Sequence, residues 1–450
     1  MAESETALRV LEGRHPDAPQ QKDLDKCVHC GLCLNACPTY RELGVEMDSP
    51  RGRIYQMVQV ATGAAPMDEG YLEHMGLCLG CRACETACPS GVEYGKLIEA
   101  ARTEIQARVK KPFPWGLIED FAFGTVLVTP WLLRYIAFKM WVYQKSGLES
   151  LVRSSGLLKL LGPLGKIEHL TPQAQLPTFY TNYGKVFFAE GPRKYRVAML
   201  GGCIANIFFA RLHEATVRVL QKNGCEVVVP ASQVCCGALH AHAGRREEAR
   251  ALARQNVDAL LATNFDAIIS NTGGCGATLK EYHDILEHDT AYHDKAKRFV
   301  AKLKDVNEFL ASIDLNTNMG RIDRRITYQD SCHLCHGQKI KAAPRKLLKS
   351  IPGLDFVEMP ASDVCCGSAG IYNIVENEMA EEILASKMKN ANSVSPDQIA
   401  SSNPGCMIQL AAGCKMHGTE KLKANPVPVM HIVELLDEAY RNAKKVDATS

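Results

Sequence analysis

The sequence predicts a protein of mixed α+β and α/β class, in which a mostly helical N-terminal domain is followed by two duplicated α/β domains with parallel strands. Three observations support this fold class. Two cysteine runs of identical spacing lie at residues 27–38 and 78–89. The second half repeats itself at an offset of about 130 residues. Short apolar runs alternate with helix-like segments in both copies, which is typical of parallel α/β units.

The composition is that of a soluble globular chain with more than one domain. The chain has 450 residues, of which 46% are hydrophobic and 23% charged, and this length exceeds one ordinary core. Lys and Arg total 52 against 50 Asp and Glu, so we expect no nucleic acid as a partner. No phosphate-binding loop, dinucleotide fingerprint or Ser-His-Asp arrangement can be recognised. We therefore assign no catalytic residue to this chain.

Cysteine is the unusual residue, at 19 per chain. The N-terminal residues MAESETALRVLEGRHPD contain neither the apolar stretch nor the cleavage site of a secretory signal. We therefore expect a cytoplasmic protein, in which clustered cysteines bind metal or carry out redox chemistry rather than form disulfides.

The N-terminal domain, predicted to span residues 1–110, carries both cysteine runs. Residues 27–38 read CVHCGLCLNACP, and residues 78–89 read CLGCRACETACP. Each is the C-x2-C-x2-C-x3-C-P run with which bacterial ferredoxins hold [4Fe–4S] clusters. Zinc, the alternative, favours paired C-x2-C units without the trailing C-x3-C-P. The sequence therefore predicts two [4Fe–4S] clusters, with a helix at residues 50–60 between the runs.

The resemblance to two-cluster ferredoxins implies crossed ligation, because there the fourth cysteine of each run serves the other cluster. One predicted cluster takes Cys27, Cys30, Cys33 and Cys88. The other takes Cys78, Cys81, Cys84 and Cys37. His29 and His74 lie beside these runs, and we interpret them as surface or hydrogen-bonding residues, since four thiolates already complete each site.

A hydrophobic helical linker is predicted at residues 111–192. Its segment 121–143 is rich in aromatic and aliphatic residues, but the uncharged run from Phe121 to Leu133 has 13 residues, fewer than the roughly 20 that span a bilayer. We favour a helix packed between domains or against a partner subunit. The alternative is an interfacial segment with basic flanks, which would place the protein peripherally on the cytoplasmic face of the inner membrane.

The repeat occupies two predicted domains, residues 193–315 and 316–450. PASQVCCGA at 230–238 nearly matches PASDVCCGS at 360–368. Each copy has a lone cysteine, a Cys-Cys-Gly and a later Gly-Cys. The candidate ligands of the first copy are Cys203, Cys235, Cys236 and Cys275. Those of the second copy are Cys332, Cys365, Cys366 and Cys406, with Cys335 as an additional candidate.

Predicted strands precede these cysteines at residues 195–200, 267–270, 325–330 and 398–402, and a helix is predicted at 245–262. Ligands of parallel α/β units gather at the carboxyl ends of the strands, so the cysteines should converge there. Cys225 and Cys414 lack a repeat partner and are interpreted as buried small hydrophobic residues. Cys332-His-Leu-Cys-His336 matches the haem attachment motif, but that chemistry needs export, so we expect the histidines to hold the loop or to hydrogen-bond a thiolate.

The repeat resembles the cysteine-rich "CCG" domain of heterodisulfide reductase and its relatives. In that family the motif ends in Cys-x-x-Cys, whereas this chain has Thr278 and Gln409 at the last positions. Four thiols remain in each copy for a further iron–sulfur cluster. The alternative is a retained fold with free or redox-active thiols.

Over nearly its whole length the chain resembles the iron–sulfur subunits of glycolate oxidase (glycolate dehydrogenase). The matching stretches are 37–57 (CPTYRELGVEMDSPRGRIYQM), 88–102 (CPSGVEYGKLIEAAR), 331–338 (SCHLCHGQ) and 365–374 (CCGSAGIYNI). The resemblance implies an electron-transfer subunit of an oxidoreductase complex. Its FAD-binding flavoprotein partners would oxidise glycolate to glyoxylate, and the electrons would pass through this chain to a quinone or other acceptor.

Two alternatives share this architecture. One is the iron–sulfur subunit of an anaerobic glycerol-3-phosphate or lactate dehydrogenase, from which the stretch at 38–57 distinguishes this chain. The other is a disulfide reductase like heterodisulfide reductase, in which the repeat itself would be catalytic. Thr278 and Gln409 argue against it, because they break both complete motifs.

Overall fold

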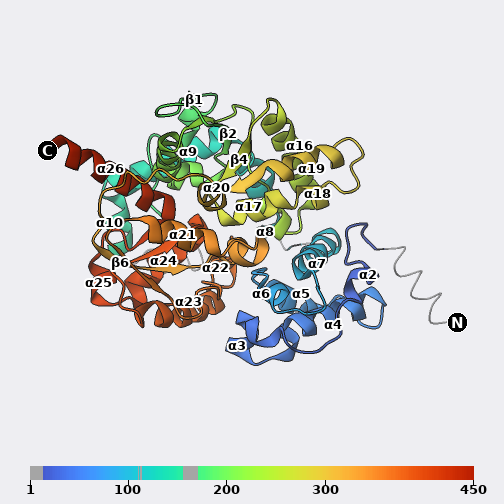
Figure 1. The fold of residues 1–450 in the computed structure, drawn as a ribbon. Coiled ribbons are helices and arrows are strands. Elements are labelled where there is room, and N and C mark those ends of the chain that lie inside the picture. Colours follow the sequence, from blue (N-terminus) through green and yellow to red (C-terminus); the bar gives the residue numbers. More distant parts are fainter. Residues whose placement is uncertain (1–13, 110, 112–113, 156–170, 450) are drawn as a thin grey trace.

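The computed structural model describes residues 14–109, 111, 114–155 and 171–449, and it confirms the predicted mixture of α+β and α/β structure. We call residues 14–109 the ferredoxin module, and residues 193–315 and 316–449 the first and second copies. In Figure 1 the ferredoxin module (blue) lies below the first copy (green to yellow) and beside the second copy (orange to red).

The ferredoxin module is mostly helical, as predicted. Its helices are α2 (Gln21–Leu24), η1 (Leu34–Ala36), α3 (Pro38–Leu43), η2 (Glu46–Asp48), α4 (Pro50–Ala61), α5 (Glu69–Gly76), α6 (Ala83–Thr86) and α7 (Tyr94–Arg108). Helix α4 is the one predicted between the cysteine runs. It begins at Pro50, which suits the first helical position, and Ser49 caps it by accepting a hydrogen bond from the Gly52 amide at 3.0 Å.

The described part of the linker is helical. It comprises α8 (Trp115–Phe121), η3 (Ala122–Val126), α9 (Pro130–Lys145) and α10 (Leu148–Ser154). Leu133 and Ala137 of α9 are buried against the first copy. No single helix in the described residues is long and apolar enough to cross a membrane, although α8–η3 and α9 pass the length and composition test together as a pair bent by 109°.

The first copy, together with residues 179–187 that precede it, is built on a five-stranded sheet of order β1-β3-β2-β4-β5, in which only β1 is antiparallel. Its strands are β1 (Val186–Phe187), β2 (Tyr195–Leu200), β3 (Cys225–Val228), β4 (Ala267–Ser270) and β5 (Leu303–Asp305). The helices are η4 (Phe179–Asn182), α13 (Ile204–Phe208), α14 (Ala210–Lys222), α15 (Ala238–His242), α16 (Arg246–Leu261), α17 (Gly273–Lys280), α18 (Tyr282–Ile285), α19 (His293–Lys302) and α20 (Val306–Ser312).

The second copy has a parallel four-stranded sheet of order β7-β6-β8-β9. Its strands are β6 (Arg324–Gln329), β7 (Leu354–Glu358), β8 (Gln398–Ser401) and β9 (Val429–His431). The helices are η5 (His333–Gly337), α21 (Ala342–Ser350), α22 (Tyr372–Val375), α23 (Asn377–Asn392), α24 (Pro404–His417), α25 (Glu420–Ala424) and α26 (Ile432–Thr449).

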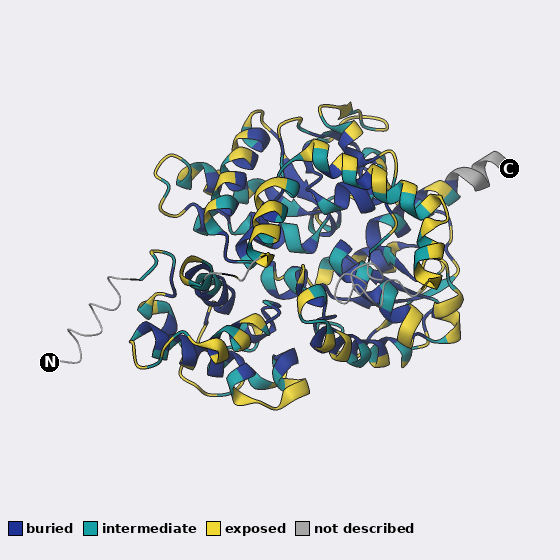
Figure 2. Ribbon diagram, turned by 180° about the vertical axis from the view of Figure 1, so that it is seen from behind, coloured by how far each residue is buried: buried dark blue, intermediate teal, exposed yellow. Residues whose placement is uncertain are grey.

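The four strands predicted before the cysteines are β2, β4, β6 and β8. Strand β6 begins one residue earlier than predicted, and the predicted helix at 245–262 is α16. Figure 2 shows the strands buried beneath helices whose outer faces are exposed. Cys225 and Cys414 are fully buried, as predicted.

The two copies share one apolar core. Residues of β2, β3 and α14 pack in the same cluster as residues of β6 and α26. Arg218 of α14 forms a two-pronged ion pair with Asp437 of α26, at 2.9 and 2.8 Å. This packing fixes the relative position of the cysteine sites of the two copies.

Candidate iron–sulfur sites

The four cysteines Cys37, Cys78, Cys81 and Cys84 form what we call the inner site. Each is 7–8% exposed. The electrostatic neighbours of the Cys84 thiol are Cys81, Cys78 and Cys37, and burial together with these thiols raises the pKa of Cys84 well above its usual value. Four buried thiols of this kind are costly to ionise alone, whereas bound iron offsets their charge.

The outer site consists of Cys27, Cys30, Cys33 and Cys88. Cys30 is exposed and the other three are half-buried. The loop that carries them also exposes Val28 (67%) and Leu32 (62%). An electron-transfer partner can therefore approach the outer site more closely than the inner one.

The structure brings together the cysteines that crossed ligation requires. Cys37, from the first run, lies with the first three cysteines of the second run. The Cys27 thiol in turn has Cys88 and Cys30 as electrostatic neighbours. The arrangement fits two [4Fe–4S] clusters, in which each thiolate binds its own iron atom. Among the described residues, no three His, Cys, Asp or Glu side chains are arranged to hold a single metal ion.

Arg53 of α4 lies beside the inner site, and the cysteine motif did not reveal it. Its side chain is 1% exposed, and its Nη1 atom lies 4.0 Å from Cys37 Sγ. The opposite side of the guanidinium is paired with Asp48, at 3.1 Å. His74 Nδ1 also contacts Asp48, at 2.9 Å. In the Arg53–Asp48 ion pair it is the guanidinium that lies next to the inner site.

Two further donors face Cys78. The Gly80 amide lies 3.4 Å from Cys78 Sγ, and the Tyr94 hydroxyl lies 3.7 Å from it. The backbone of Gly80 is left-handed, with φ of 63°, which lets this tight loop close around the sulfur. Hydrogen bonds to cluster sulfurs raise the reduction potential, because they stabilise the added negative charge.

Arg51 is the matching arginine of the outer site. It lies two residues before Arg53 on α4 and donates to the carbonyl oxygen of His29 at 2.9 Å. Unlike Arg53, it is solvent-accessible and is paired with the exposed Glu46 at 2.6 Å. Gly52 lets α4 approach η2 this closely, since a side chain there would collide with the carbonyl oxygen of Glu46. His29 is exposed, as predicted.

In the first copy, Cys203, Cys235, Cys236 and Cys275 meet at the carboxyl end of the sheet. Cys203 Sγ lies 3.2 Å from Cys235 Sγ. Hydrogen bonds from Cys203 and Cys236 lower the pKa of Cys235 well below its usual value, while the pKa values of Cys203 and Cys236 are raised. One thiolate stabilised by two neighbouring thiols is a donor set that suits a cluster.

The second copy repeats this arrangement with Cys332, Cys365, Cys366 and Cys406. Here the hydrogen bonds from Cys332 and Cys366 lower the pKa of Cys365. Cys335 does not join the group. Its thiol faces the Cys332 carbonyl oxygen at 3.7 Å, and its electrostatic neighbours are Asp330, Lys341, Asp363 and Lys387.

The histidines after Cys332 hold this copy against the ferredoxin module. His333 Nε2 lies 3.0 Å from the Gly80 carbonyl oxygen, and His336 Nδ1 lies 2.8 Å from Thr86 Oγ1. The expectation that they hold the loop is therefore confirmed. Thr278 and Gln409, which replace the last motif cysteines, are both buried.

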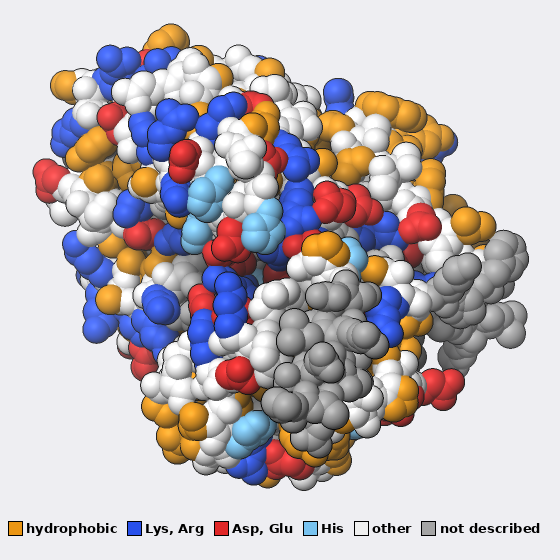
Figure 3. Space-filling view, turned by 90° about the vertical axis from the view of Figure 1, so that its right-hand side faces the viewer, with side chains coloured by type: hydrophobic (Ala, Val, Ile, Leu, Met, Phe, Trp, Pro, Cys, Tyr) orange, Lys and Arg blue, Asp and Glu red, His pale blue; other side chains and the backbone are white. Residues whose placement is uncertain are grey.

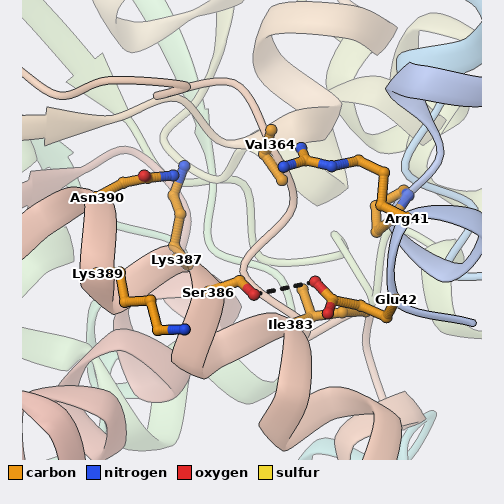
Figure 4. Close-up of a pocket in the computed structure, with 9 residues that line it drawn as sticks. Arg41, Glu42, Val364, Ile383, Ser386, Lys387, Lys389 and Asn390 are labelled. Carbon is orange, nitrogen blue, oxygen red and sulfur yellow. Dashed lines mark hydrogen bonds between the residues drawn. The ribbon is translucent and has the colours of Figure 1, made fainter.

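The inner site and the second copy are in direct contact. Cys81 and Cys365 belong to one buried cluster, with Cys332 packed against it. A cavity of about 210 Å³ lies beside this contact, between α3 and α23, and Figure 4 shows Lys387, Ser386 and Lys389 of α23 facing Arg41 and Glu42 of α3 across it. The Ser386 hydroxyl donates to Glu42 at 3.0 Å.

Charged residues join the ferredoxin module to the first copy. Glu99 of α7 lies 2.9 Å from His242 Nδ1, and Arg82 is paired with Glu281. These ion pairs lower the pKa of Glu99 to about 2, against the effect of its burial. On the face shown in Figure 3, Lys, Arg, Asp, Glu and His side chains lie intermixed near the middle of the molecule.

The linker is buried only in part, and packing against a partner subunit, the second form of the favoured prediction, stays a prediction. Phe123, Leu133 and Ala137 are buried. Large apolar side chains remain exposed on α8, α9 and α10, namely Trp115, Leu117, Ile118, Phe121, Trp131, Tyr135, Phe138, Val142, Leu148 and Leu151. We call these ten residues the linker surface.

Comparison with known proteins identifies the domain types. A 4Fe-4S dicluster domain matches residues 23–92, a cysteine-rich domain matches 197–280 and 326–411, and the linker region of the glycolate oxidase iron-sulfur subunit matches 115–171. These matches confirm the predicted iron–sulfur class of cofactor.

Curated relatives extend over nearly the whole chain. The probable glycolate oxidase iron-sulfur subunit of Bacillus subtilis is 39% identical over 440 residues, which are 97% of this chain and 98% of the relative. The glycolate oxidase iron-sulfur subunit of Escherichia coli is 32% identical, over 92% and 94%. One of the subunits of the fumarate reductase (CoM/CoB) from Methanothermobacter marburgensis is 30% identical, over 94% and 74%. This chain therefore belongs to the family of glycolate oxidase iron–sulfur subunits.

Proposed function

We propose that this chain is the electron-transfer subunit of a complex that oxidises glycolate to glyoxylate. The observation that carries the proposal is the packing of the outer-site cysteines against the cluster that contains Cys78 and Cys84 of the inner site, together with the contact of the inner site with the second copy. The relatives from B. subtilis and E. coli support the choice of glycolate, because both are named as glycolate oxidase subunits.

The outer-site and inner-site cysteines of this chain would each hold one cluster of the electron-transfer path. When bound, [4Fe–4S] clusters supply one-electron carriers, which connect a two-electron flavin to a later acceptor. Cys27, Cys30, Cys33 and Cys88 would hold the cluster that faces the FAD-binding flavoprotein partner. Cys37, Cys78, Cys81 and Cys84 would hold the second cluster in a site from which water is largely excluded. Substrate binding and removal of hydride belong to the partner.

The linker surface is proposed to bind a partner subunit. Its exposed aromatic residues form an apolar area of the kind found at interfaces. Two nearby acidic residues are paired with basic ones, as in Lys111–Glu119 and Arg153–Glu149, while α9 carries Arg134, Lys139 and Lys145 and no acidic residue. We propose a cytoplasmic complex, with a quinone or other acceptor. Attachment to the cytoplasmic face of the inner membrane is the alternative.

The test is anaerobic affinity purification from the native host, followed by addition of glycolate, D-lactate or glycerol 3-phosphate. Reduction of the clusters by glycolate, seen as visible bleaching and electron paramagnetic resonance (EPR) signals, with a flavoprotein in the preparation, is the expected result. Reduction by another of the three substrates alone would replace glycolate in the proposal. Reduction by dithionite only, with no flavoprotein present, would contradict it.

A matched pair of variants tests the linker surface. Trp131→Ser and Phe138→Ser remove exposed apolar side chains of α9 and should release the co-purifying flavoprotein without loss of iron. Val427→Ser, at an exposed apolar residue outside the linker, serves as control. Retention of the flavoprotein together with loss of binding to anionic lipid vesicles would show that membrane attachment is the correct interpretation.

A further inference from the structure

The two copies differ in what surrounds their cysteines. In the second copy, Cys365 and Cys332 pack against Cys81 of the inner site. In the first copy, Cys203, Cys235 and Cys236 lie in an apolar cluster with Leu133 and Ala137 of the linker, and this cluster contains no residue of the ferredoxin module as described. An electron leaving the inner site therefore meets the second copy first.

The copies also differ in charge at one matching position. Helices α16 and α23 each have 16 residues, and their fourth residues, Ala249 and Ala380, both pack against the glycine of Cys-Cys-Gly. The eleventh residue of α16 is Asn256, and the eleventh of α23 is Lys387. The repeat thus places a neutral amide in one copy where the other has a lysine.

Both residues hold the loop that precedes Cys-Cys-Gly. Asn256 donates to the Cys235 carbonyl oxygen and accepts from the Val234 amide, each at 2.9 Å. Lys387 donates to the carbonyl oxygens of Ala361 and Ser362, at 3.0 and 2.7 Å. The structural role is therefore conserved between the copies, while the ammonium charge is an addition of the second copy.

The Lys387 charge acts mainly on the cysteines. Its side chain is 1% exposed, and its charged or ionisable neighbours are Cys365, Cys366, Asp330, Asp363 and the more distant motif residue Cys335. The two carboxylates have other cations, because Asp330 is paired with Arg345 at 2.7 Å and Asp363 with Lys341 at 2.9 Å. A buried positive charge stabilises a centre that gains an electron, and water does not screen it.

We propose that electrons pass from the inner site directly into the second copy, and that Lys387 gives the centre held by Cys332, Cys365, Cys366 and Cys406 a higher reduction potential than that of the first copy. In this step one electron leaves the inner site and one enters the second copy, with no bond made or broken. The inference rests on the proposed electron-transfer function and adds the order of the sites.

The test uses the full chain in its complex, purified anaerobically, and a redox titration followed by EPR. The signal that Cys366→Ala abolishes identifies the second copy, and the signal that Cys236→Ala abolishes identifies the first. Lys387→Asn introduces the residue of the first copy. It should lower the reduction potential of the second-copy centre by at least about 59 mV, which is a tenfold loss of affinity for one electron.

Two controls accompany this variant. Lys387→Arg keeps the charge and should keep the potential. Lys389→Asn removes an exposed lysine two residues away on the same helix and should leave the potential unchanged. An unchanged potential in Lys387→Asn, or an equal shift in Lys389→Asn, would overturn the proposal.

A kinetic measurement on the unaltered protein covers the case in which Lys387→Asn does not fold. After rapid mixing with less than one electron equivalent of reductant, the second-copy signal should appear before the first-copy signal. The reverse order would overturn the inference, and so would unchanged iron content and signals in Cys366→Ala. Neither result affects the proposed function, which fails only if glycolate does not reduce the clusters of the ferredoxin module.

Discussion

The inner and outer sites have the same cysteine spacing but different surroundings. Both come from a C-x2-C-x2-C-x3-C-P run, and both have an arginine of α4 beside them. Arg53 of the inner site is buried and contacts Asp48, whereas Arg51 of the outer site is only partly buried and contacts the exposed Glu46. The outer site lies in an exposed loop, and the inner site touches the second copy.

The difference shows that the cysteine motif specifies the cluster ligands, whereas burial and nearby charges specify the reduction potential of each site and its place in electron transfer. A charge in water is screened within about 8 Å at physiological ionic strength, while a buried charge is screened much less. We therefore expect the inner site to have the higher potential, so that electrons enter at the outer site and move inward. Each prediction below compares an inner residue with its outer counterpart.

The largest effect is expected from removal of a ligand. Cys84→Ala should lose about four iron atoms per chain and abolish electron delivery to the second copy, because the inner site is the contact between the two. Cys30→Ala should also lose iron but leave the inner signal in place. Iron analysis and EPR provide the measurement. Delivery to the second copy that persists in Cys84→Ala would break the predicted order of sites.

Replacement of Arg53 should destabilise the protein much more than replacement of Arg51. Arg53→Gln leaves Asp48 buried without its cation, which costs about 3–5 kcal/mol. Arg51→Gln removes an exposed ion pair, which is worth less than about 1 kcal/mol. The measurement is the denaturant midpoint of cluster absorbance under anaerobic conditions. Equal midpoints would show that burial does not distinguish the two arginines.

The buried Glu99 should contribute more to the free energy of unfolding than the exposed Glu46, and its contribution should depend on pH. The pKa of Glu99 in the folded protein is about 2, below its unfolded value of 4.5. Its ion pairs therefore add about 3 kcal/mol above pH 4.5, and this contribution is lost as the pH falls towards 2. Glu99→Gln should lose this stability at pH 7, whereas Glu46→Gln, at an exposed pair, should lose less than about 1 kcal/mol.

The pH dependence is measured as the stability difference between Glu99→Gln and the unaltered chain, since acid effects on the clusters then cancel. The difference should narrow by about 1 kcal/mol as the pH falls from 5 to 4. A difference that widens as the pH falls would contradict the depressed pKa.

The smallest effect on the reduction potential is expected from removal of a single hydroxyl group, that of Tyr94. Tyr94→Phe removes the donor 3.7 Å from Cys78 Sγ. It should lower the reduction potential of the inner-site cluster by less than about 59 mV, which corresponds to less than a tenfold change in electron affinity. Tyr55→Phe changes a half-exposed residue near the outer loop and should leave the inner potential unaltered. A redox titration followed by EPR compares them. No shift in Tyr94→Phe would show that this contact is too long to act as a hydrogen bond.

Local patterns in the sequence predicted most of the fold. The strands β2, β4, β6 and β8, the helices α4 and α16 and the duplication could be found because apolar periodicity and repeated Cys-Cys-Gly are features of neighbouring residues. The strands β1, β3, β5, β7 and β9 were not predicted, because runs of two to five residues without a following cysteine carry too little periodicity. The linker was only partly predicted, since its apolar residues do not indicate which of them have a neighbour.

The sequence by itself determined the cofactor class, the candidate ligands and the family, because thiol spacing is a property of the chain. Only the tertiary structure placed Arg53 behind Cys37, set Cys365 against Cys81 and aligned Lys387 with Asn256. These contacts join residues far apart in the chain, and their electrostatic strength depends on burial, which arises when the module and the two copies pack together.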